Sequence, residues 1–269
     1  MEIDERYHDL PISVDYEASI IKSDGSCEKR IKTVMAEHKI DVYINDILTM
    51  KLMCLPEYLT ELVLGRMLTE GIIKNSDEVK NIYVCEYGKW ARVILNKDVP
   101  QKKKELFATE NNFVETTQSC CTENHVINDL FTEKGLPSKV VSIPCDAEDI
   151  FFMAKHFADD TPLHKKTGAT HSCFLYQNKE ILFECEDIGR HNAIDKCLGY
   201  ALRENIDVKK CMLYTSGRLS TDMVLKAVKA GLPVIVSKAA PSSDAIEIAK
   251  YFNLKLVCHA RKDSYVEIE

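Results

Sequence analysis

Two adjacent cysteines, Cys120 and Cys121, are the residues of this chain whose placement most suggests covalent chemistry. They lie in the run SCCTENH, residues 119–125, which shows neither a helical nor a strand period. A thiolate in contact with water is the reactive form of cysteine, and a loop tether lets one sulfur reach two partners. His125 either lowers the pKa of a neighbouring thiol or is simply solvated. A fortuitous cysteine pair in a polar loop is the alternative interpretation.

The composition agrees with free thiols. The 269 residues include 11 Cys, an odd number, and the N-terminal MEIDERYHDL is acidic and polar, unlike an export signal. We therefore expect a cytoplasmic protein without a disulfide framework, in which the other nine cysteines pack as small apolar residues. The hydrophobic share of 45% excludes a disordered chain. A net charge of −7 argues against a general nucleic-acid binder, and no apolar run is long enough to span a membrane.

A second group of candidate residues lies in four loops of the second half, each of which follows a predicted strand. The loops are DIGRH (187–191), SGR (216–218), KAAPSS (238–243) and HARKDS (259–264). Alternating strands and helices predict mostly parallel strands, whose carboxyl ends share one edge of the sheet. Three of the loops precede helix N-termini, which favour anions. The loops carry the basic residues Arg190, His191, Arg218, Lys238, Arg261 and Lys262. They predict a phosphate-binding edge, and ordinary polar turns are the alternative.

Motifs of other enzyme classes are incomplete. A zinc deaminase needs H-x-E and P-C-x-x-C, but Pro144-Cys145 is followed by Asp-Ala-Glu, and His171-Ser-Cys173 lacks the glutamate. The chain contains no G-x-S-x-G, no P-loop and no G-x-G-x-x-G. We therefore expect no catalytic metal, and phosphate binding falls to the four loops.

Hydrophobic periodicity predicts an α/β fold with a small N-terminal α+β unit and a C-terminal domain with a mixed or parallel sheet. The expected domains are residues 1–112 and 136–269, joined by a cysteine-bearing loop at 113–135. In the first domain we expect strands at 39–45, 47–54, 81–87 and 90–96, and a helix after Pro56 with one apolar stripe that ends at Gly71. Residues 100–119 read as a polar linker, and 126–135 as a short helix. In the second domain we expect strands at 171–177, 180–186, 211–215, 233–237 and 255–258, and helices at 147–158, 192–204, 220–231 and 244–252.

The second half also resembles the FdhD family of formate dehydrogenase accessory sulfurtransferases. The family pattern T-G-x-x-H is present at Thr167–His171, and E-D-x-G-R-H-N-A-x-D-K at Glu186–Lys196. Further matches are SGR at 216–218, GLPV at 231–234, APSS at 240–243 and, in the first half, LMCLPEYLTELVLGRMLTEGII at 52–73. The resemblance covers roughly residues 38–265.

This resemblance implies a sulfur carrier. It implies that a cysteine persulfide is received from a cysteine desulfurase and passed to a molybdenum or tungsten bis-guanine-dinucleotide cofactor, the cargo, for use by formate dehydrogenase. It also implies a cytidine-deaminase-like second domain without zinc, and a homodimer. The family's S-C-G-x-C-G loop places the carrier at Cys120, a glycine position at Cys121 and the second cysteine position at Glu123, so Cys121 is an auxiliary thiol.

The resemblance also suggests which residues contact the cofactor. The family's contact segment corresponds to His259, Ala260, Arg261, Lys262, Asp263 and Ser264, to which we add His171, Arg190, His191 and Arg218. The two histidines either order the loops or contact phosphate. Asp187 either receives a guanine edge or caps the following helix. Two functions remain open: a sulfurtransferase that uses Cys120, or a non-catalytic chaperone for the guanine-dinucleotide cofactor.

Overall fold

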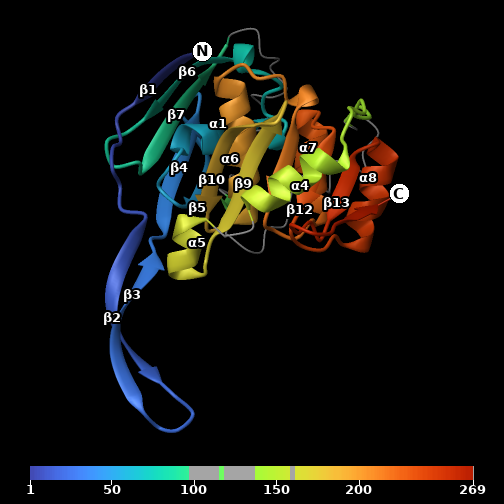
Figure 1. The fold of residues 1–269 in the computed structure, drawn as a ribbon. Coiled ribbons are helices and arrows are strands. Elements are labelled where there is room, and N and C mark those ends of the chain that lie inside the picture. The colour runs from blue at the N-terminus through green and yellow to red at the C-terminus, as the bar shows by residue number, and fades with distance from the viewer. Residues whose placement is uncertain (97–114, 118–136, 158–160, 269) are drawn as a thin grey trace.

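The computed structural model describes residues 1–96, 115–117, 137–157 and 161–268, which form two six-stranded sheets and a projecting hairpin (Figure 1). The first sheet has the order β1 (Glu2–Glu5), β6 (Val79–Val84), β7 (Trp90–Leu95), β4 (His38–Ile44), β5 (Ile47–Cys54) and β8 (Glu115–Thr117). The second has the order β10 (Glu180–Asp187), β9 (His171–Gln177), β11 (Met212–Thr215), β12 (Val234–Ser237), β13 (Lys255–Cys258) and β14 (Val266–Ile268).

The hairpins of both sheets turn where the sequence predicts. Asn45 and Asp46 between β4 and β5, and Asn178 and Lys179 between β9 and β10, all have positive φ. Two-residue hairpin turns of this kind match the twist of the strands and favour Asn and Asp. The predicted strand pairs are therefore confirmed. Part of the predicted linker, by contrast, forms strand β8, which pairs with β5.

The second sheet is mixed rather than mostly parallel. β11, β12 and β13 run parallel, but β9 is antiparallel to both of its neighbours and β14 is antiparallel to β13. The predicted mixed or parallel sheet is therefore confirmed in its mixed form: β10 to β13 run in one direction, and the predicted hairpin of β9 and β10 reverses the chain without a crossover helix. β14 follows the last basic loop and was not predicted.

Helices separate and cover the two sheets. They are α1 (Leu59–Thr69), α4 (Ala147–His156), α5 (Pro162–Thr167), α6 (Arg190–Arg203), α7 (Thr221–Ala230) and α8 (Ser243–Phe252), with short 3₁₀ turns η1 (Ser76–Glu78) and η2 (Val208–Lys210). α1 packs on α6, and α6 packs on β9 and β10. α4 covers the other face of the second sheet, where Ile150 and Met153 join a separate apolar cluster. No helix in the described part of the chain has the length and apolarity of a membrane span.

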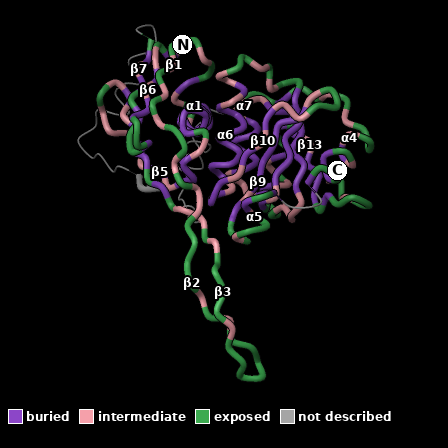
Figure 2. The backbone as a smooth tube through the Cα atoms, turned by 60° about the vertical axis from the view of Figure 1, so that its left-hand side comes forward, coloured by how far each residue is buried: buried purple, intermediate pink, exposed green. Residues whose placement is uncertain are grey.

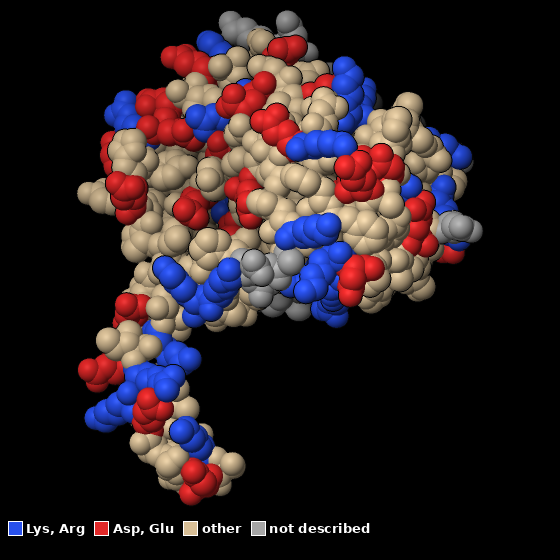
Figure 3. Space-filling view, viewed as in Figure 1, with Lys and Arg blue, Asp and Glu red and all other residues tan. Residues whose placement is uncertain are grey.

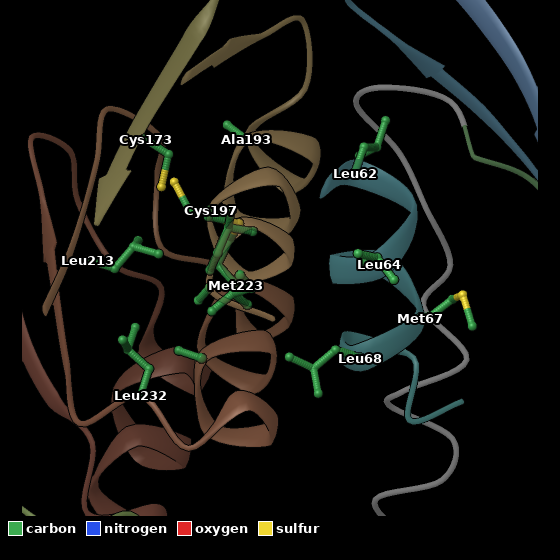
Figure 4. Close-up of a cluster of buried hydrophobic side chains, with 14 of the residues drawn as sticks. Leu62, Leu64, Met67, Leu68, Cys173, Ala193, Cys197, Leu213, Met223 and Leu232 are labelled. Carbon is green, nitrogen blue, oxygen red and sulfur yellow. The ribbon is translucent and has the colours of Figure 1, made fainter. Parts of the chain in front are cut away.

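The single apolar stripe expected for α1 was wrong. All eleven residues of α1 are buried, including Glu61 and Arg66. The reason is its position, since α1 lies between the first sheet and α6 and has no solvent-facing side (Figures 2 and 4). Polar side chains in such a place need partners, and these partners tie the two halves of the chain together, as described below.

Helices α1 and α6 touch through their backbones at two glycines. A Cβ atom at Gly65 would lie 1.8 Å from the carbonyl oxygen of Asp195, and one at Gly199 would lie 1.8 Å from that of Glu61. Only glycine permits this approach. One hydrophobic core includes Val42 of β4 and Leu213 of β11. Figure 4 shows the part of this core from Leu68 of α1 through Cys197 of α6 to Leu213. The predicted domain boundaries remain predictions, but the two halves share this core.

A long hairpin, which we call the arm, projects from the body. It consists of β2 (Ser13–Ile21) and β3 (Cys27–Met35) and was not predicted from the sequence (Figures 1 and 2). Its root lies beside α5, where Ile12 and Met35 contact a small cluster of Leu55, Leu163 and Ile188. Cys27 on β3 is exposed, so the expectation that nine cysteines are packed was wrong at this position; Cys145 is partly buried, and the other seven described cysteines are buried.

Candidate functional site

The basic loops lie together at one edge of the second sheet. β10, β11, β12 and β13 all end at this edge, and β9, which is antiparallel to β10 and β11, begins there with His171. The predicted convergence of the four loops is therefore present. Lys and Arg side chains are visible along the lower side of the body, the side from which the arm projects (Figure 3).

Hydrogen bonds join these loops into one surface. The amide of Ser216 donates to the carbonyl of Ser172 over 3.0 Å, which connects the second loop to β9. The hydroxyl of Ser237 donates to the carbonyl of Gly217 over 2.8 Å, and its own carbonyl accepts from the amide of Ala260 over 2.9 Å. Ser237 therefore links the second loop to the fourth. The linking role of these serines was not predicted from the sequence.

Arg190 and the two imidazoles form the first part of the site. Arg190 begins α6 and packs on Gly217, where an added Cβ would lie 2.8 Å from the Cβ of Arg190. Burial lowers the pKa of His171, and the nearby Arg190 and His164 lower it further. Burial likewise lowers the pKa of His191 to about 2, with further contributions from Lys226 and Arg190. Both histidines are therefore neutral at pH 7, beside permanent positive charge.

His191 faces the N-terminus of α7. Its side chain is 8% exposed, and its Nε2 lies 3.9 Å from Oδ2 of Asp222, too far for a hydrogen bond. Among the described residues, His191 Nε2, Ser220 Oγ and Asp222 Oδ1 are buried without a hydrogen-bond partner. Ser220 is the N-cap residue of α7 but its side chain makes no capping bond. Buried polar atoms without a partner are unusual in a folded protein, and these three lie at a helix N-terminus, which favours anions.

The last loop, His259–Ser264, combines a fixed backbone with exposed side chains. His259 is exposed and has a φ of 50°, and the guanidinium of Arg261 donates to the carbonyls of Lys238 and Ala260. The Ala260 side chain is buried in the core, so it offers only backbone atoms to a ligand. Lys262, Asp263 and Ser264 are exposed, whereas the ammonium of Lys238 lies 5.0 Å from the ring centre of Phe157.

Several residues of the run DIGRHNAIDK, 187–196, bond to the first half of the chain and hold the two halves together. Asp187 is fully buried, and its carboxylate accepts from the Leu55 amide over 3.1 Å and pairs with Lys196 at 2.7 Å. It also accepts from the Gly189 amide and the Asn192 amide group, and Asn192 donates to the carbonyl of Met53 over 2.7 Å. Asp187 was considered as a guanine contact or as a helix cap. Fully buried, its carboxylate instead holds the turn at Gly189, the N-cap residue of α6, which is closer to the capping role.

A second set of polar contacts between the two halves is a buried charge cluster between α1, α6 and α7. The ammonium of Lys226 on α7 contacts both oxygens of Asp195 at 2.8 and 2.7 Å and Oγ1 of Thr69 at 2.9 Å. Arg66 lies 3.7 Å from the same carboxylate and 3.1 Å from Glu70. These groups come from α1, α6 and α7. The buried charges are therefore paired, and they hold the first half of the chain on the second.

Glu186 orders the segment in front of β9. Its carboxylate accepts hydrogen bonds from the amides of Leu163 and His164 and from the hydroxyls of Thr161 and Thr170. The side chain of Thr161, the N-cap residue of α5, makes no capping bond. The Glu186 carboxylate takes its place by accepting from the first backbone amides of the helix. Glu186 therefore fixes the segment that leads to His171.

Cys120 and Cys121 lie outside the described residues, as does the helix predicted at 126–135. The described cysteines differ from the predicted carrier. Cys173, Cys185 and Cys197 meet in the core, with Sγ of Cys185 3.8 Å from that of Cys197, and burial raises their pKa. No set of three or more His, Cys, Asp or Glu within the described ranges could hold a metal ion.

Comparison with known proteins gives a consistent result. Residues 35–267 match the model of the FdhD/NarQ family. A protein named sulfur carrier protein FdhD from Staphylococcus haemolyticus (strain JCSC1435) is 30% identical over 251 residues, 92% of each chain. Its counterpart from Bacillus pumilus (strain SAFR-032) is 28% identical over 242 residues, 90% of each chain. A crystal structure described as a formate dehydrogenase accessory protein from Desulfotalea psychrophila matches with a TM-score of 0.75 and 26% identity, covering 96% of this chain and 97% of that one.

Proposed function

Because the chain belongs to the FdhD/NarQ family, we propose that it is a sulfur carrier required for formate dehydrogenase activity. In this proposal Cys120 receives sulfur from a cysteine desulfurase in the cytoplasm. The sulfur is then delivered to a molybdenum or tungsten bis-guanine-dinucleotide cofactor held at the carboxyl edge of the second sheet. The observation that carries the binding part is the joined surface of basic loops and helix N-termini around Arg190 and His191.

The loading step needs only a thiolate and a sulfur donor. The Cys120 thiolate attacks the outer sulfur of the persulfide on the desulfurase. A new sulfur–sulfur bond forms on Cys120, the old one breaks, and the desulfurase cysteine leaves as a thiolate, so no external oxidant is consumed. The residues between the two halves, where Cys120 lies in the sequence, provide the tether.

The described edge fits a cargo that carries several phosphates. α6 and α7 begin there. The N-cap residue of α6 is Gly189, which has no side chain, and the Ser220 side chain makes no capping bond at α7, so no side-chain cap competes with phosphate oxygens for the first backbone N–H groups. Arg190, Arg218 and Lys262 supply positive charge, while the neutral His171 and His191 donate or accept single hydrogen bonds. When bound, the cargo supplies the metal that accepts the sulfur.

A second candidate function is a cofactor-binding chaperone that transfers no sulfur. The observation in its favour is that the basic edge is built without any exposed cysteine among the described residues. In that case guanine-nucleotide binding and activation of formate dehydrogenase both persist when Cys120 and Cys121 are replaced.

Mass spectrometry tests the carrier directly. After incubation with a desulfurase and cysteine, we expect a mass increase of about 32 Da, one sulfur atom, on the peptide that contains Cys120. Cys120→Ala abolishes the adduct and the activation of formate dehydrogenase in cells lacking their own accessory protein. Cys121→Ala is the matched control at the neighbouring thiol. Full activation by Cys120→Ala contradicts the carrier assignment.

Calorimetry with guanosine diphosphate tests the edge separately. We expect Arg218→Ala to weaken binding by about tenfold, since one charged hydrogen bond to phosphate is lost. Lys80→Ala, an exposed position on the distant strand β6, is the matched control. Equal binding by the wild type and Arg218→Ala removes the loop edge from the proposal but leaves the carrier cysteine untouched.

A further inference from the structure

The second basic loop, SGR (216–218), contacts α6 at Gly217 although one strand lies between them. The loop follows β11 and α6 follows β10, and the sheet order β10-β9-β11 places β9 between these two strands. A Cβ atom built on Gly217 would nevertheless lie 2.8 Å from Cβ of Arg190, 3.2 Å from its Cδ and 3.5 Å from its Cγ. The aliphatic part of the Arg190 side chain therefore lies along the backbone of Gly217.

The backbone of Gly217 is held in place by buried hydroxyl groups on both sides. Its amide donates to Oγ1 of Thr215 over 3.2 Å, and its carbonyl accepts from the Ser237 hydroxyl over 2.8 Å. Thr215 and Ser237 are both fully buried. Arg190 is the first residue of α6, so the helix backbone fixes its Cβ. A side chain at position 217 would therefore displace the Arg190 side chain.

Glycine is needed at position 217 for space and not for backbone conformation. Gly217 is absent from the described residues with positive φ, so alanine can adopt its backbone without strain. Glycine also serves where a chain segment must approach another closely, because it has no Cβ atom. At Gly217 the group that approaches is the stem of Arg190.

This arrangement brings two guanidinium groups to one imidazole. Burial lowers the pKa of His171, and the positive charges of Arg190 and Arg218 lower it further, so both groups lie near this ring. Like charges repel each other, and an anion between them removes that cost. A guanidinium group binds phosphate oxygens through two parallel N–H groups. Two guanidinium groups side by side therefore match the two phosphates of one diphosphate.

We infer that Gly217 is a positioning residue of the proposed cargo site: it leaves the space that places the Arg190 guanidinium near that of Arg218, and the two together hold one diphosphate group. The inference rests on the proposed function, because the diphosphate is that of a guanine-dinucleotide cargo. Gly217 offers no side chain to this cargo and acts through Arg190.

Calorimetry with GDP and GMP measures the preference for a diphosphate. We expect the wild type to bind GDP at least about tenfold more tightly than GMP, since the second phosphate gains a charged hydrogen bond. Gly217→Ala should weaken GDP binding by about tenfold and change GMP binding by less than about twofold, because only the second phosphate loses its partner. Gly71→Ala, beyond the end of α1, is the matched control. Its Cβ meets no atom within 4 Å and its φ is +73°, so it reports whether a loss of stability alone weakens binding.

A double variant shows whether Gly217 acts through Arg190. Arg190→Gly removes the guanidinium group together with the Cβ that a methyl group at position 217 would meet. In this background Gly217→Ala should cause no further loss of GDP affinity. Losses that add up in the double variant mean that Gly217 has only a structural role, and they overturn the inference. Circular dichroism of each variant confirms that it is folded.

The outcomes separate this inference from the proposed function. A wild type that binds GDP no better than GMP overturns the inference, and so does a Gly217→Ala protein that binds GDP as tightly as the wild type. In both cases the proposed cargo site stands. A wild type that binds neither nucleotide overturns the cargo site and the inference together. The sulfur adduct on Cys120 is independent of all these results, because the loading step uses no residue of the basic edge.

Discussion

Replacing Gly199 by alanine tests whether the close contact of α1 and α6 organises the fold. In a solvent-exposed helix, replacing glycine by alanine raises the free energy of unfolding by about 1 kcal/mol, because alanine is the better helix former. Here the new Cβ would stand 1.8 Å from the Glu61 carbonyl oxygen, whereas an ordinary carbon–oxygen contact needs well over 3 Å. The helices must therefore separate by about 1.5 Å, and a gap of that size forfeits much of the dispersion energy along the contact.

We expect Gly199→Ala to lower the free energy of unfolding by at least about 3 kcal/mol. Part of this loss comes from the buried ion pair of Asp195 with Lys226, because α6 carries Asp195 and moves with it. Urea denaturation followed by circular dichroism measures the change. Gly168→Ala is the control: its Cβ meets no atom within 4 Å, but φ is +67°, so it reports only the cost of the left-handed backbone, about 1–2 kcal/mol. A Gly199→Ala protein as stable as the wild type refutes the reasoning.

Three further predictions concern buried polar groups. The pKa of His191 is lowered in the folded state, so the unfolded chain binds the extra proton first and stability falls as the pH drops below 6.5. Between about pH 7.5 and pH 5 the wild type should lose about 2 kcal/mol more of its free energy of unfolding than His191→Gln, as measured by urea denaturation at each pH. The same pH dependence in both proteins contradicts the assignment. Lys226→Met should cost about 3–5 kcal/mol and Asp195→Asn in the same chain should recover part of it, measured by the same method; a strictly additive double variant argues against a pair. Glu186→Gln should speed amide hydrogen exchange at the N-terminus of α5 and leave α7 unchanged, whereas equal exchange in both helices means that the cap is not local.

Local signals predicted most of the elements. The Asn45-Asp46 and Asn178-Lys179 turns mark their hairpins because Asn and Asp tolerate positive φ better than most residues, and Lys179 follows Asn178 into the same turn. Asp146 caps α4 by accepting from the Asp149 amide, as its position before the helix indicates. These features depend on neighbours in sequence, so a single chain suffices to find them.

Features that depend on distant residues were not predicted. The apolar pattern of α1 could not show that Glu61 and Arg66 are also buried, because their partners lie on α6 or beyond it. The hairpin arm was missed although its apolar residues alternate with charges, as in a strand, because no described residue beyond its root covers it and its faces enter no core. The role of Asp187 depends on Leu55, 132 residues away, and no local pattern carries that information.

The buried ion pairs and hydrogen bonds between the two halves also determine what happens when the chain is divided. If residues 136–269 were produced alone, Lys226 and Asp195 would lose Thr69 and Arg66, and Asp187 would lose the Leu55 amide. The fragment would also expose the face of α6 that α1 covers. The segment that carries Cys120 and Cys121 therefore does not separate two independent bodies. The described residues before and after it, in β8 and from residue 137 onward, both belong to this jointly packed body, so cutting within the segment separates parts that hold each other in place.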